Sequence, residues 1–177
     1  MVADINIMRV TTSSSTLTDI TSACTRISTS DSPTPALTNP IPIPTSGSNY
    51  SYWATTTLYA ASPADNSINN ITWYSDGVNS FGTGVSATVA TASQFVVPTG
   101  TAGSSGIILS TGCHGGLNGA PSSLFLYTSS CQLAVAGSVA AVTGSFGEKV
   151  VFQVSIDTTA SPGNSGEETV TWQFDET

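Results

Sequence analysis

Charged residues are scarce in this chain of 177 residues. They make up 8% of the sequence, against roughly 25% in an average soluble domain. Only three are cationic, Arg9, Arg26 and Lys149. Binding to a nucleic-acid backbone needs a cluster of cations that releases counterions, and a chain with a net charge of −8 has no such cluster. We therefore expect no nucleic-acid partner.

Histidine and cysteine are almost absent as well. His114 is the single histidine, and the three cysteines are Cys24, Cys113 and Cys131. One imidazole cannot build a histidine-rich metal site, and it leaves no spare base for a Ser-His-Asp triad. Cys113 and His114 are neighbours, but adjacent residues of an extended chain point apart. We predict an exposed loop histidine and three small buried thiols, with a Cys113–Cys131 disulfide as the alternative, and no catalytic residue.

Long hydrophobic runs are missing too. No segment reaches the roughly 18 apolar residues of a membrane span. Residues 1–10, MVADINIMRV, lack the basic stretch and apolar run of a secretory signal. We expect a protein made in the cytoplasm, without a membrane partner. Without an export signal, the glycosylation patterns at Asn49 and Asn70 carry little weight.

Oxygen ligands are the only raw material for a metal site. The candidates are Asp65, Asp76, Asn79, Glu167, Glu168, Asp175 and Glu176. Such ligands suit calcium, but their spacing does not follow an EF-hand. We interpret them as a solvated acidic rim, and we expect neither a metal nor a cofactor.

The chain does contain segments in which apolar residues stand at every second position. Val150, Phe152, Val154 and Ile156 alternate with polar or smaller residues, which predicts a strand with one buried face. Residues 170–174 alternate in the same way, and the turn-forming segment 159–166 separates the two as antiparallel partners. Further strands are predicted at 4–10, 52–61, 68–75, 84–90, 106–110 and 123–128, with weaker candidates at 20–28 and 134–142.

Sustained helical periodicity is absent, and Thr, Val and Ser fill the candidate segments. Turn signals separate the strands at intervals close to those of β-sandwiches. We therefore predict an all-β fold, an antiparallel β-sandwich of immunoglobulin-like or jelly-roll type. The aromatic residues of 50–74 are expected in a core or a subunit interface, although a carbohydrate-binding face would look similar.

Proline divides the chain. Five prolines fall within residues 31–48, so this segment should run extended, either as a flexible linker or as a strap docked on the sandwich. The predicted organisation is an N-terminal arm or strand region (1–30), a Pro-rich strap (31–48) and a sandwich domain (49–177). The arm pairs either with its own domain or with a neighbouring subunit. The candidate assembly contacts are Ile5, Ile7, Val10, Leu37, Ile41 and Ile43.

Three segments carry a resemblance to a known class. They are TNPIPIPTSGSNYSYWATTTLYA (38–60), INNITWYSDG (68–77) and TASPGNSGEETVTWQFDET (159–177). Together they resemble small β-sandwich virion structural proteins of tailed phages and related viruses. The resemblance consists of turns and strands, so it transfers no catalytic residue. It implies a module on the virion, with capsid decoration or cementing as its role and assembly in the host cytoplasm.

We therefore expect a non-enzymatic protein. Its partners would be the major capsid protein or other virion proteins, and it would self-associate, with a trimer as the expected symmetry. Low charge and many hydroxyls suit dense packing, in which like charges would repel. The alternative is a self-polymerising extracellular filament subunit that donates its N-terminal strand to a neighbour.

Overall fold

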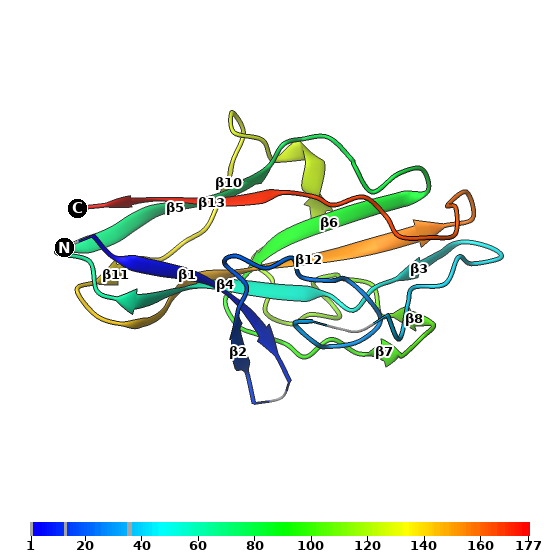
Figure 1. Cartoon of the computed structure of the whole chain (residues 1–177), viewed down its shortest axis with the longest axis horizontal. Helices are drawn as coiled ribbons and strands as arrows, with labels where there is room; N and C mark the ends of the chain where they lie inside the picture. The colour runs from blue at the N-terminus through cyan, green and yellow to red at the C-terminus, as the bar shows by residue number, and fades with distance from the viewer. Residues whose placement is uncertain (1, 13, 35–36) are drawn as a thin grey trace.

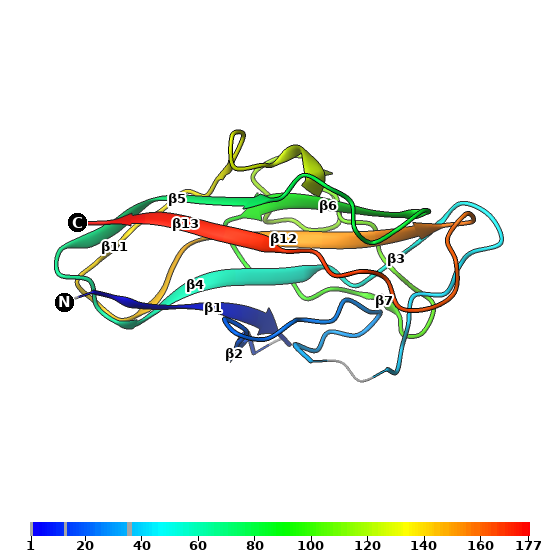
Figure 2. The same ribbon diagram turned by 45° about the horizontal axis from the view of Figure 1, so that its top comes forward.

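The chain folds into an elongated sandwich of two β-sheets, with both termini at the same end (Figures 1 and 2). This computed structural model describes residues 2–12, 14–34 and 37–177. Met1 of the predicted arm and Pro35 of the predicted strap lie outside the described residues. All strand pairs in the described part are antiparallel. The all-β sandwich predicted from the sequence is confirmed, and its assignment as immunoglobulin-like or jelly-roll stays a prediction.

The larger sheet has the order β2-β1-β4-β12-β6-β9, and β3 pairs with the end of β12. Its strands are β1 (Asp4–Thr11), β2 (Thr16–Asp19), β3 (Ser48–Tyr50), β4 (Ala54–Ser62), β6 (Val85–Ala92), β9 (Ser122–Ser123) and β12 (Gly144–Asp157). The long β12 lies at its centre, between β4 and β6. At its two margins lie β2, with four residues, and β9, with two.

The smaller sheet is built around β5 (Ser67–Ser75). Strand β13 (Val170–Glu176) pairs along one edge of β5, and the short β10 (Leu133–Ala134) and β11 (Val139–Ala140) share the opposite edge. β7 (Gly100–Thr101) and β8 (Ser105–Gly106) form a separate small hairpin, and the 3₁₀ helix η1 spans Leu124–Leu126. No helix in the described residues is long and apolar enough to span a membrane.

The main core fills the space between the two sheets, because alternate residues of their strands point inward. Leu58 of β4, Trp73 of β5 and Val150 of β12 are among its fully buried side chains. Trp172 and Phe174 of β13 pack against this core from the edge of the smaller sheet. The alternation that the sequence shows in these strands is therefore the alternation of the two faces of each sheet.

A second core lies on the other face of the larger sheet. Trp53, Ala92, Leu109 and Val151 form it, and residues 93–121 cover it. The prediction that β12 buries only one face is therefore wrong. Val151 is fully buried and Gln153 is 2% exposed, because the long connection packs over the face that alternation alone assigns to solvent.

Strands β12 and β13 are not partners, contrary to the prediction. β12 belongs to the larger sheet and β13 pairs with β5, so residues 158–169 cross from one sheet to the other (Figure 1). The turn-forming residues of this segment suit a crossing connection as well as a hairpin.

Four predicted strands are shortened or absent. Residues 20–28 form turns and irregular chain, residues 106–110 contribute only the end of β8, and residues 134–142 hold only β10's second residue and β11. Residues 123–128 are mostly η1 and its flanks. In 107–109 the backbone binds a side chain instead of a neighbouring strand: Gln153 Nε2 donates to the Ile107 carbonyl at 2.8 Å.

The N-terminal segment is a strand of the larger sheet. β1 pairs with β4 from Asp4 to Val10 and with β2 at its far end. The described parts of the following connection, residues 20–34 and 37–47, pack beside it, and Ile27 and Ile41 contact the main core. This connection includes the Pro-rich segment, which therefore docks on the sandwich through Ile41.

Candidate functional site

The six predicted assembly contacts are mostly used within the chain itself. Val10 is 2% exposed, Ile5, Ile7 and Ile41 pack against the main core, and Ile43 is half-buried. Leu37 is the exception, with 76% of its surface exposed. The structure thus places four of these side chains against the chain's own sheets and leaves Leu37 alone on the surface.

A buried ion pair holds β1 against the chain that follows it. Arg9 is 3% exposed, and its Nη2 lies 3.9 Å from Asp31 Oδ1. The other Asp31 oxygen accepts a hydrogen bond from the Thr12 N–H at 2.8 Å. Burial lowers the pKa of Arg9 to about 10, against the opposing effect of Asp31, so the guanidinium stays charged at neutral pH. The pair is a structural brace.

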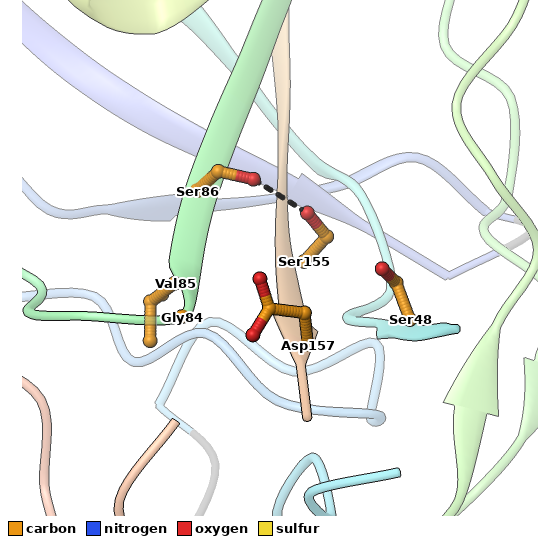
Figure 3. Close-up of a pocket in the computed structure, with 6 residues that line it drawn as sticks. All are labelled: Ser48, Gly84, Val85, Ser86, Ser155 and Asp157. Carbon is orange, nitrogen blue, oxygen red and sulfur yellow. Dashed lines mark hydrogen bonds between the residues drawn. The ribbon is translucent and has the colours of Figure 1, made fainter. Parts of the chain in front are cut away.

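A shallow hollow of about 130 Å³ lies where β3, β6 and β12 meet (Figure 3). Its polar side chains are Ser48, Ser86, Ser155 and Asp157, and the Ser86 and Ser155 hydroxyls are 2.7 Å apart. Asp157 Oδ1 accepts hydrogen bonds from the hydroxyl (2.6 Å) and the N–H (2.7 Å) of Thr159. These bonds, the side-chain one first, lower the pKa of Asp157.

This hollow offers three serines, a carboxylate already bonded to Thr159, and no histidine. The Ser86 and Ser155 hydroxyls have each other as partners, and the single histidine is buried beside Trp53. A serine nucleophile needs an adjacent base held by a third group. Within the described ranges no three His, Cys, Asp or Glu side chains gather to hold a metal ion. We therefore assign no catalytic or metal-binding role to this hollow.

His114 is buried, which corrects the prediction of an exposed loop histidine. Its ring packs edge-on against Trp53, with centroids 5.3 Å apart. Neither ring nitrogen has a hydrogen-bond partner among the described residues, and burial lowers the pKa of the imidazole. The cause is the covering segment 93–121, which carries His114 into the second core. The neighbouring thiol does not join it, because Cys113 is exposed.

The cysteine prediction is also wrong. Cys24, Cys113 and Cys131 are all exposed and unpaired. They lie in loops or at the edge of short strand-like segments, where their small size is not needed for packing. Neither the buried-thiol interpretation nor the disulfide alternative describes this structure.

The aromatic cluster is internal. Trp53 and Trp73 are 2% exposed or less, and the tyrosines of residues 50–74 are half-buried. The large apolar side chains that are exposed in the described part are aliphatic. A sugar platform needs several aromatic faces in the open, so the core interpretation of these residues is the one that the structure supports.

The most distinctive open feature is the outer edge of β13. One edge of its seven residues pairs with β5, and within the described residues no strand pairs with the other. An unpaired edge presents a row of backbone N–H and C=O groups to any strand that can reach it. The margins of the larger sheet, β2 and β9, are much shorter.

The direction of the backbone groups follows from the bonds that β5 makes on its far side. The Ser75 N–H donates to the Tyr127 carbonyl, and the Ile71 carbonyl accepts from the Val135 N–H, both at 2.9 Å. Successive residues of a strand point their backbone groups to opposite edges. The backbone groups of the odd-numbered residues in this half of β5 thus point away from β13, and those of Thr72 and its even-numbered neighbours point toward it.

The same alternation applies to β13. Thr171 pairs with Tyr74, and Gln173 pairs with Thr72, so these two residues of β13 direct their backbone groups to β5. Trp172 and Phe174 consequently direct theirs outward. In the described part of the chain, no hydrogen bond from another segment reaches these outward groups.

A second hollow, of about 360 Å³, opens at the end of this edge. Val2, Asp65, Glu176 and Thr177 line it. Glu176 Oε1 accepts a hydrogen bond from the Ala3 N–H at 2.8 Å, which ties the two chain ends together. The hollow therefore combines an exposed apolar side chain with two carboxylates, at the point where β13 ends.

Sequence reasoning found β13 but not its open edge, because it paired the strand with β12. It interpreted Glu176 as part of a solvated rim, since nothing local indicates that the N-terminus returns to it. It also missed Gln153, although a signal existed: Val150, Val151 and Phe152 form a continuous apolar run, which is typical of a strand buried on both faces.

Comparisons with protein-family models, with curated proteins and with solved structures found no match to this chain. The inferences below therefore depend on the sequence and the geometry alone.

Proposed function

We propose that this protein is a non-enzymatic structural component of a virion, which binds the particle surface as a capsid decoration or cement protein. The observation that carries the proposal is the unpaired outer edge of β13, a row of backbone groups available to another protein. The larger sheet, by contrast, is completed by its own chain: residues 93–121 cover one face, and Asp31 holds β1 through its contacts with Arg9 and Thr12.

The surface composition supports the same role. The chain has three cations and a net charge of −8, and Ser and Thr dominate its polar residues. A protein packed densely on a lattice benefits from a surface that stays hydrated without strong like-charge repulsion. Its partners would be the major capsid protein or other virion proteins, with symmetric self-association, as a trimer, increasing avidity.

The alternative, a filament subunit that donates its N-terminal strand, places a larger demand on the fold. β1 pairs with β4 over seven positions, and Arg9, Val10 and Thr11 are buried. Donation would have to break these contacts before a neighbour could replace them. We therefore favour the particle role, in which β1 stays in its own sheet.

The test follows the chain through particle purification. An antibody raised against the purified protein is used on density-gradient fractions and in immunogold electron microscopy of virions from its source. We expect the chain to band with intact particles and the gold label to lie on their outer surface. Its absence from particles would contradict the proposal. Long filaments formed by the purified protein alone would establish the filament alternative instead.

A further inference from the structure

The outer edge of β13 is an incomplete binding site, and its surroundings indicate what completes it. Trp172 and Phe174 direct their backbone groups outward, in the register derived above. Gln173 and Asp175 are exposed on the same stretch, so this half of the strand is the more accessible one. An extended segment placed here would add a strand to the smaller sheet through main-chain hydrogen bonds.

The charge around the edge is acidic at both ends. Glu167 and Glu168 precede β13, and Asp175 and Glu176 end it. In an antiparallel pair of two β13 strands centred on Trp172, Glu168 of each copy would face Glu176 of the other. Like charges placed opposite each other destabilise a strand pair. The edge therefore disfavours a second copy of this chain and favours a cationic strand.

The hollow beyond the strand strengthens this choice. A lysine or arginine side chain has an apolar stem and a charged head, and the hollow offers Val2 for the stem and the Glu176 carboxylate for the head. Val2 is 82% exposed, which leaves its apolar surface available.

We infer that the outer edge of β13 accepts an extended, basic segment of a partner protein, with one Lys or Arg side chain in the hollow formed by Val2, Asp65, Glu176 and Thr177. That the partner is a virion protein rests on the function proposed above. The site itself is a β-strand edge with an acidic end, and it can be tested without any particle.

The probe is a short amidated peptide of alternating Thr and Val with Lys at both ends, so that either strand direction brings a cation to the hollow. Two matched peptides carry Glu in place of Lys, or a central Pro that cannot donate to the added ladder. Binding to the full-length protein is measured by fluorescence anisotropy. Backbone amide exchange of the protein, followed by NMR, shows where the peptide lies.

Three variants of the protein sharpen the test. Glu176→Gln removes the charge but keeps an oxygen for the Ala3 N–H, and Glu176→Lys reverses the charge. Glu167→Lys is the matched control, because Glu167 is an exposed glutamate at the opposite end of β13. We expect Glu176→Lys to weaken binding of the Lys peptide about tenfold, and both Glu176→Gln and Glu167→Lys to weaken it less, the latter because Glu167 lies outside the hollow.

The inference is supported if the Lys peptide slows exchange of the Trp172 and Phe174 amides and the Glu and Pro peptides do not. It is overturned if those amides are unaffected at millimolar Lys peptide, or if the Glu peptide binds equally well. A dimer of the protein alone that protects the same amides also overturns it. If the protein binds the Lys peptide but is absent from particles, the site stands and the proposed function is rejected. If the protein is present on particles but does not bind the peptide, the proposed function stands and the site is rejected.

Discussion

The larger and the smaller sheet of the sandwich are completed to different degrees. In the larger sheet, both faces of β12 are buried, and its margins end in the short β2 and β9. In the smaller sheet, β13 is seven residues long and pairs on one edge alone within the described part. The chain thus uses its long connections to close the larger sheet and leaves the backbone of the smaller sheet open. This difference is the basis of our proposal that a partner binds at the smaller sheet.

The largest expected effect concerns a side chain that closes the larger sheet. Gln153 is 2% exposed, its Nε2 donates to the carbonyls of Ser51 and Ile107, and its Oε1 accepts from the Leu109 N–H at 2.6 Å. Gln153→Ala leaves these groups unpaired beside a cavity, so we expect the free energy of unfolding to fall by about 3–5 kcal/mol. Chemical denaturation measures this loss.

Gln173→Ala in the smaller sheet is the matched control. Gln173 is exposed, and its Oε1 accepts a hydrogen bond from the side-chain amide of Gln132 at 2.9 Å. The loss of this side chain should lower the free energy of unfolding by no more than about 0.5 kcal/mol. Equal losses for the two variants would show that the two sheets are completed alike, and would break the comparison.

The ion pair beneath β1 gives the next largest effect. Asp31→Asn keeps an acceptor for the Thr12 N–H but leaves the buried Arg9 charge without its counterion. We expect it to lower the free energy of unfolding by about 3 kcal/mol. The double variant Arg9→Met, Asp31→Asn removes both charges together, so its effect should stay within about 1 kcal/mol. The two variants are compared by thermal and chemical unfolding, and the reverse order of effects would refute the brace.

Several of these features follow from the sequence. Strands β1, β5, β12 and β13 were predictable because each alternates over at least five residues, and alternation reflects the two faces of a sheet. The second core was not predictable in the same way. Its cover, residues 93–121, contacts β12 from far along the chain, and only the apolar run 150–152 signals a strand buried on both faces.

The candidate site was less predictable than the fold. The segment 159–166 contains turn formers that suit either a hairpin or a crossing between sheets, so the sequence could not assign β13 to β5. The acidic hollow depends on Val2 and Glu176, which lie at opposite ends of the chain. Of the six predicted contact residues, Leu37 is the one that the fold leaves on the surface, because the other five lie on strands or on chain docked against them.

The smallest expected effect concerns His114 in the second core. Burial lowers its pKa below the ordinary 6.5, so below about pH 6.5 the unfolded chain binds a proton that the folded chain resists. The free energy of unfolding should therefore fall as the pH is lowered from 7 to 5. Asp19 and Asp157 have pKa values lowered from 3.8 by hydrogen bonds from Thr21 and Thr159. Their protonation therefore reduces the free energy of unfolding only at more acidic pH.

His114→Phe is the variant that isolates this contribution. It removes two unpaired ring nitrogens and keeps an edge-on aromatic contact with Trp53. We expect stability at pH 7 to be unchanged or to rise by about 1 kcal/mol, and the dependence between pH 7 and 5 to flatten. A pH dependence equal to that of the unsubstituted protein would show that His114 is not its source.

Backbone amide exchange of the free, monomeric protein tests the central claim most directly. If the outer edge of β13 is open, the Trp172 and Phe174 amides should exchange rapidly, while the Thr171 and Gln173 amides, which face β5, should be protected like those in the middle of β12. Protection of all four β13 amides in the monomer would show that the edge is already covered, and would contradict this account of the protein.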